Sequence, residues 1–259
     1  MLQIGNHIIL DQLSSWPKNI LQLIEKQEYS LRCYLQEEKR IDNLCRTDLK
    51  IRYNRPQNPF GEIWIEVVDT IEAVLQDFKI VGFHCTRLMD YEIKNVIENG
   101  LIPLDINFAN NRINTLFDNG LISEELRNQI IDKAELSEDI RAGKIFTFHC
   151  LSTLKEECSF NKLFGLWGGE SVYQYLKDSK ELSQIGIPCI VLASIKIAEL
   201  DIYPILSRRM LCIYFHDNYH PHDNVSVFEK KLNVLKVIQR DNKLFNKLTN
   251  IESWSEKID

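Results

Sequence analysis

The sequence predicts a mixed α and β protein, and three observations support this. Helical periodicity dominates the first 45 residues, strand-like apolar runs recur from residue 78 onward, and a proline and glycine cluster at 55–61 stands between them. Apolar residues make up 44% of the 259 residues, which is ample for a hydrophobic core without disulfide bonds. We therefore expect an α+β fold with an N-terminal helical extension.

Composition and charge exclude several classes of protein. The seven cysteines form an odd set with no CxxC pair and no secretory leader before them, which predicts reduced thiols in the cytoplasm. No segment approaches the roughly 18 uninterrupted apolar residues of a membrane span, so we expect no membrane partner. The net charge of −6 disfavours general electrostatic binding to nucleic acid, although it leaves room for a local basic groove.

The N-terminal segment predicts a helix that begins after Ser14-Ser-Trp-Pro17. Proline suits the first turn of a helix, and an apolar stripe of Ile20, Leu21, Leu23 and Ile24 follows. The turn cluster at 55–61 is the best candidate boundary. We expect a helical extension over residues 1–60 and the main domain over residues 61–259.

The main domain opens with a strand over residues 78–87, then a helix over 89–99 that stops at Gly100. Residues 105–142 read as a helical insertion, where Ser123 and two glutamates are typical of a helix start. Strands are predicted over residues 144–150, 187–197 and 210–215, and a last strand over 225–228 or 232–238. Residues 163–175 read as a strand, a double-glycine turn and a helix.

Three segments carry candidate chemistry. In Gly82-Phe-His84-Cys85-Thr86-Arg87, the histidine and threonine alternate on one strand, so both side chains would face the same side and hold a polar ligand. The alternative is a half-buried strand histidine with a satisfied hydrogen bond. Arg87 is a candidate for neutralising a phosphate group, or it forms a surface ion pair.

The second segment is Trp167-Gly168-Gly169-Glu170. Two glycines let the backbone approach a ligand closely, and the carboxylate opens a helix, where it also complements the helix dipole. The neighbouring aromatic residues Tyr173 and Tyr175, like Trp167, either stack on a flat ligand or join the core. A routine strand-to-helix turn is the alternative.

The third segment, His216-Asp-Asn-Tyr-His-Pro-His222-Asp223, has enough nitrogen and oxygen ligands for a divalent metal. Its proline disfavours a helical pair of histidines, so a loop site is expected. Metal-assisted hydrolysis is the reaction that such a site would support. The alternative is a solvated loop, because the spacing matches no established zinc signature.

Taken together, the strand with His84 and Thr86, the following helix and Gly100, and the later Trp167 to Tyr173 segment resemble the histidine-type ADP-ribosyltransferase superfamily. The resemblance covers roughly residues 78–240 and implies a split β-sheet, with NAD as a substrate. It implies that His84 holds a ribose hydroxyl and that a tyrosine stacks on nicotinamide, for which Tyr173 fits best and Tyr175 is the alternative. Cys85, Arg87, Trp167, Gly168 and Gly169 flank these positions and are further candidates for binding NAD.

The family's third motif supplies an acidic residue near a late strand, for which Glu229 and Asp223 are candidates. Glu170 is a further candidate, because the Trp-Gly-Gly-Glu segment departs from the usual second motif and places a carboxylate at the mouth of the same cleft. The resemblance implies transfer of ADP-ribose to a macromolecular acceptor, protein or nucleic acid, as many bacterial toxins and defence enzymes of this superfamily do. A cognate inhibitor or antitoxin would then be a second partner. A module that binds a nucleotide without catalysis is a further alternative.

Overall fold

The computed structural model describes residues 2, 4–133, 142–174, 176, 180–200, 206–217 and 225–255. The helices are α1 Lys18–Lys26, α2 Glu28–Thr47, α3 Leu49–Tyr53, α4 Gly61–Leu75, α5 Asp90–Asn99, α6 Ile106–Asp118, α7 Glu124–Lys133, α8 Glu157–Gly165, α9 Glu170–Tyr173, α10 Lys180–Gln184, α11 Leu206–Phe215 and α12 Lys243–Thr249. The strands are β1 His7–Ile8, β2 Lys79–Leu88, β3 Ile145–Phe148, β4 Ile187–Lys196, β5 Val225–Phe228 and β6 Asn233–Gln239. The expected mixed α and β class is confirmed.

The described strands form a six-stranded sheet in the order β5-β3-β2-β4-β6, with β1 paired to β2. Strands β2 and β4 pair antiparallel along their whole length, from Lys79 opposite Lys196 to Leu88 opposite Ile187. The junction between β2 and β3 is much shorter, with Phe83 opposite Phe148 as its registered pair. Only β1 pairs in the parallel sense. The sheet is therefore mainly antiparallel, and β2 lies at its centre.

Helices cover both faces of this sheet because side chains alternate along each strand. One face carries Ile80 and Leu88 of β2 and packs against α1, α4, α5 and α11. The other face carries Val81 and Phe83 and packs against α8 and α12. Central strand β2 is consequently buried on both sides, and His84 belongs to the face that holds Ile80.

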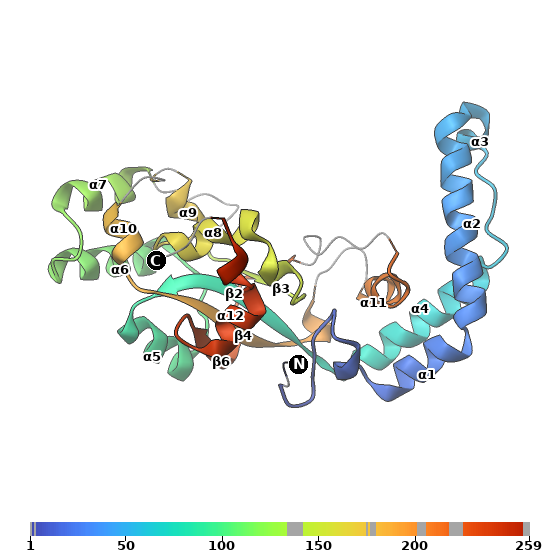
Figure 1. The fold of residues 1–259 in the computed structure, drawn as a ribbon, viewed down its shortest axis with the longest axis horizontal. Coiled ribbons are helices and arrows are strands. Elements are labelled where there is room, and N and C mark those ends of the chain that lie inside the picture. The colour runs from blue at the N-terminus through green and yellow to red at the C-terminus, as the bar shows by residue number, and fades with distance from the viewer. Residues whose placement is uncertain are drawn as a thin grey trace.

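The N-terminal helices begin where the sequence predicts. Helix α1 follows Pro17 and buries Ile20 and Ile24. Ring stacking of Tyr34 in α2 on Trp64 in α4, at 4.3 Å between centroids, joins this extension to the main domain. Figure 1 shows α2 and α3 standing away from the sheet at one end of the molecule, with α6 and α7 at the other. Strand β1 also lies within the expected extension, yet it joins the sheet.

Two helix ends in the main domain also lie where the sequence predicts them. Helix α5 ends at Gly100, whose φ of 80° suits glycine, and an added Cβ there would lie 2.4 Å from the Leu232 carbonyl oxygen. The expected insertion contains α6 and α7, and the Ser123 hydroxyl accepts a hydrogen bond from Leu126 N. The glycine and the capping residue therefore predicted these helix ends correctly.

Two strand predictions are wrong. Residues 210–215 belong to α11, and the expected strand at residue 163 belongs to α8. Both segments are short apolar runs, which periodicity alone cannot assign to a buried strand or a buried helix. Helix α11 is buried on several sides, at residues that include Leu206, Met210 and Ile213, and it packs against α4. The runs at 225–228 and 233–239, given as alternatives, are both strands.

Two expectations from composition concern thiols and membranes. All seven cysteines are free thiols, and Cys85, Cys150 and Cys189 are buried. Within the described ranges, no helix combines the length and apolar character that crossing a bilayer requires.

Candidate functional site

His84 lies near the middle of β2 with its ring half-buried on the face that holds Ile80. Its Nδ1 lies 2.9 Å from the carbonyl oxygen of Phe146 in β3. A carbonyl only accepts hydrogen bonds, so the neutral imidazole carries its proton on Nδ1. The Nε2 lone pair is then an acceptor, and it has no partner among the described residues.

Electrostatics favour this neutral form. Burial lowers the pKa of His84 below its ordinary value, and the positive charge of Arg112 lowers it further, while the hydrogen bond to Phe146 opposes both. The ring is therefore uncharged at neutral pH. A neutral ring with an unoccupied acceptor nitrogen is suited to a hydroxyl group of a ligand.

Thr86 follows two residues later on the same strand and is likewise half-buried, so the expected pair does share one face. Its hydroxyl makes a weak contact of 3.4 Å with the Arg87 carbonyl oxygen. The pair forms a short polar strip on an otherwise apolar face of β2.

This polar strip continues across the neighbouring strands. Because Phe83 lies opposite Phe148 in an antiparallel pair, His84 stands beside Thr147, which in turn lies opposite Ser226 of β5. The Thr147 hydroxyl is buried without a hydrogen-bond partner in the described part of the chain. Burying a polar side chain without a hydrogen-bond partner is costly, and Thr147 is such a side chain.

His149, just beyond β3, completes the row. Its Nδ1 lies 3.1 Å from the Val81 carbonyl oxygen and its Nε2 lies 2.8 Å from the Ser226 hydroxyl. Burial is the main cause that lowers the pKa of His149 to about 4. Both ring nitrogens are thus satisfied inside the protein, which makes His149 a structural partner rather than an open ligand site.

Helices α5 and α6 hold a buried ion pair whose positive charge acts on His84. Arg112 of α6 donates from Nε to Glu92 Oε1 of α5 at 2.5 Å, and Glu92 Oε2 accepts from Met89 N at 2.8 Å. The Arg112 guanidinium lies 4.6 Å from the centroid of the Trp167 ring. Its Nη2 is buried without a partner among the described residues. The pair therefore brings a positive charge with unused hydrogen-bonding capacity close to His84.

The Trp-Gly-Gly-Glu turn is thereby joined to the same region. Trp167 is 2% exposed and its Nε1 lies 3.4 Å from Glu92 Oε2, so it supports Arg112 from below instead of offering a free ring face. Gly168 and Gly169 have positive φ, and a Cβ on Gly168 would lie 2.4 Å from Val172. Glycine is thus required at Gly168 by packing.

The turn ends in Glu170, an exposed residue that begins α9 and accepts a hydrogen bond from Gln174 Nε2 at 3.0 Å. Tyr173 closes this short helix, and its side chain lies outside the described structure. Tyr175 is outside the described residues altogether.

Cys85 and Arg87 lie on the opposite face of β2 from His84. The Cys85 thiol is buried, and burial raises its pKa well above the ordinary value. Arg87 is 3% exposed and donates to the carbonyl oxygens of Ile185, Phe164 and Gly186 at 2.9, 2.7 and 2.9 Å. Arg87 thus ties the end of β2 to α8 and to the turn before β4.

Glu229 follows directly after Phe228, the last residue of β5, and is exposed. Phe228 lies opposite Ile145, where β3 begins, and β3 runs antiparallel to β2. Glu229 therefore lies at the end of the sheet where β2 finishes, two strands and roughly 10 Å across from it. It makes no ion pair or hydrogen bond with the described residues. Asp223 lies outside the described residues.

The segment expected to bind a metal is described only at its start. His216 directly follows α11 in a left-handed conformation, and Asp217 forms an ion pair with Lys39 of α2. Residues 218–224 lie outside the described structure. Among the residues it does cover, no group of three or more His, Cys, Asp or Glu side chains could hold a metal ion.

Sequence reasoning missed four residues of this region: Glu92, Arg112, Thr147 and Ser226. Glu92 occupies the third position of α5, where a carboxylate commonly caps the helix start. Arg112 lies among the buried Ala109, Ile113 and Leu116 of α6, and an arginine within an apolar stripe was the available signal.

Comparison of this chain with protein-family models, with curated proteins and with solved structures gives no match in any of the three.

Proposed function

We propose that the protein is an NAD-dependent ADP-ribosyltransferase that modifies a macromolecular acceptor. The observation that carries the proposal is the state of His84: a neutral ring, held through Nδ1 by the Phe146 carbonyl, with an unoccupied Nε2 acceptor. Such a nitrogen is suited to a ribose hydroxyl, which needs an acceptor. Thr86 on the same face adds a second polar group.

The surroundings of His84 suit the rest of a dinucleotide. Arg112 supplies a positive charge beside the ring, and a diphosphate linkage needs such a charge nearby. The glycines at 168 and 169 let backbone approach a ligand, next to the Arg112 and Trp167 contact. The limited pairing between β2 and β3 is compatible with a sheet split at this junction, as the superfamily resemblance implies.

The reaction would proceed by cleavage of the bond between the ribose C1′ and the nicotinamide nitrogen. The bonding electron pair leaves with nicotinamide, and the ribose passes through an oxocarbenium-like state that a carboxylate stabilises. The nucleophile of the acceptor then bonds to C1′ and gives up its proton. Glu170 and Glu229 are the described candidates for this carboxylate, and Asp223 is the third.

Nicotinamide release from NAD by purified protein tests the proposal, with and without cell extract as a source of acceptor. We expect release that depends on extract in the wild type, and at least about tenfold less with His84→Ala. His7→Gln is the matched control, because His7 lies in β1, opposite Lys79 at the start of β2, and its Nε2 lies 2.8 Å from the Ser194 hydroxyl. Equal release by wild type and His84→Ala would contradict the site assignment.

A protein that binds NAD tightly without releasing nicotinamide would instead be a nucleotide-binding module. Release that depends on an added divalent metal and is insensitive to His84→Ala would favour hydrolysis at residues 216–223.

A further inference from the structure

A second polar site lies on the face of the sheet that points away from His84. Ile238 at the end of β6 packs with Ile190 and Leu192 in the core of that face, and Arg240 follows two residues later. Arg240, Asn246, Ile251 and Glu252 line a pocket of about 300 Å³ there. A pocket of this size lies at the lower end of the range for small-molecule sites.

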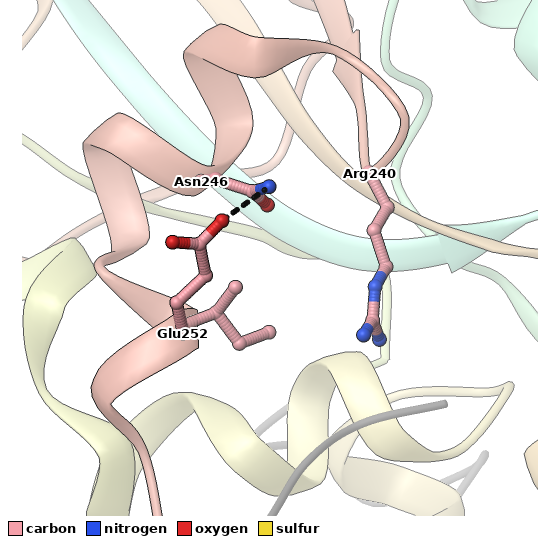
Figure 2. A pocket seen from close by; sticks show the side chains of 4 residues that line it. Arg240, Asn246 and Glu252 are labelled. Atoms are coloured by element: carbon pink, nitrogen blue, oxygen red, sulfur yellow. Dashed lines mark hydrogen bonds between the residues drawn. The ribbon is translucent and has the colours of Figure 1, made fainter.

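Arg240 gives this pocket an unused positive charge. Figure 2 shows its side chain reaching down along one side of the pocket, across from Asn246 and Glu252. Its Nη1 is buried, and no described residue accepts a hydrogen bond from it. A buried guanidinium N–H without a partner is costly, and an anion would satisfy it.

A neighbouring arginine strengthens the preference for an anion. The pKa of Arg87 is lowered to about 10, mainly by burial and next by the positive charge of Arg240. The two guanidinium groups therefore repel each other. Arg87 already donates to backbone carbonyls and has no carboxylate partner among the described residues. A bound anion would relieve this repulsion.

The opposite wall has the complementary character. Asn246 Nδ2 donates to Glu252 Oε1 at 3.4 Å, so a carboxylate and a side-chain amide line the wall across from Arg240. A ligand that satisfied both walls would carry an anionic group at one end and a hydrogen-bond donor at the other. About ten water-sized groups fill such a volume, which limits the ligand to a small molecule.

We propose that this pocket binds a small zwitterion, with its anionic group on Arg240 and its ammonium group toward Glu252 and Asn246. The site is independent of the proposed NAD site, because it lies on the other face of the sheet and shares none of its residues.

Calorimetric titration of the full chain with O-phosphoethanolamine and with inorganic phosphate tests the proposal without any activity measurement. The wild type should bind phosphoethanolamine at least about tenfold more tightly than phosphate, since the ammonium group adds one charge-assisted contact. Glu252→Gln should remove that difference. Arg240→Gln should weaken both ligands by about tenfold or more.

Arg52→Gln, on exposed α3, is the matched control and should bind like the wild type. The Arg240 guanidinium makes no hydrogen bond to the described residues, so its replacement should leave the melting temperature unchanged. Arg240→Lys is a second variant, which keeps the positive charge. Absence of binding by the wild type at millimolar ligand, or equal affinity in Arg240→Gln, would overturn the proposal.

Discussion

The two faces of strand β2 use polar residues in opposite ways. Arg87 on one face is almost fully buried, and its guanidinium donates hydrogen bonds to backbone carbonyl oxygens. His84 on the other face is half-buried and has one ring nitrogen fixed and the other unoccupied. A buried polar group whose hydrogen bonds all end inside the protein contributes to stability, whereas one left open is available to a ligand. The difference separates a structural residue from a candidate binding residue only three positions away.

Removal of Arg87 tests the structural side of this comparison and should have the largest effect. Arg87→Met leaves the carbonyl groups of Ile185, Phe164 and Gly186 without their donor, which should lower the free energy of unfolding by about 3–5 kcal/mol. Urea denaturation measures this change. Arg32→Met, which breaks an exposed pair with Glu28, should cost about 0.5 kcal/mol or less. A similar cost for the two variants would mean that the buried hydrogen bonds of Arg87 contribute little to stability.

The proposed chemistry is tested by replacing each described carboxylate candidate. Either Glu170→Gln or Glu229→Gln should lower nicotinamide release by at least about 100-fold while NAD affinity stays within about twofold, since the carboxylate acts on the transition state. The unaffected variant of the two serves as the control. Full activity in both variants would exclude both residues and leave Asp223 as the remaining candidate.

A third prediction concerns His149, which differs from His84 in that both of its ring nitrogens have hydrogen-bond partners inside the protein. Its pKa is about 4 in the folded protein and near 6.5 when unfolded, so the unfolded state binds more protons between these values. The contribution of His149 to stability is therefore complete above pH 6.5 and is lost as pH falls toward 4. At pH 5 the loss should be about 2 kcal/mol.

Urea denaturation at pH 7.5 and pH 5 measures this effect as a difference between wild type and His149→Gln, which cannot titrate at that position. The stability gap between the two proteins should shrink by about 2 kcal/mol at the lower pH. A gap that is the same at both pH values would mean that the folded protein leaves the His149 pKa unchanged.

The sequence predicted those parts of the fold that depend on local signals. Pro17 before α1, Ser123 before α7 and Gly100 after α5 each act within a few residues, and all three helix ends are confirmed. The assignment of residues 210–215 as a strand is wrong because a short apolar run does not distinguish a buried strand from a buried helix, and the burial of α11 depends on packing against α4.

In the candidate site, too, features set by local sequence were predictable and features set by packing were not. Strand alternation predicted that His84 and Thr86 share a face, and the structure agrees. The partners of His84 could not be read from the sequence, because Phe146 is 62 residues away and Arg112 and Glu92 meet only through the packing of α6 on α5. Contacts between distant segments decide which polar residue is satisfied and which is open.

Direct titration of the protein with NAD tests the central claim, that the open nitrogen of His84 binds the dinucleotide. Wild type and His7→Gln should bind NAD with equal affinity, and His84→Ala should bind at least about tenfold more weakly, the equivalent of one charge-free hydrogen bond lost in a buried site. Unchanged affinity in His84→Ala, with an unchanged fold, would contradict the account.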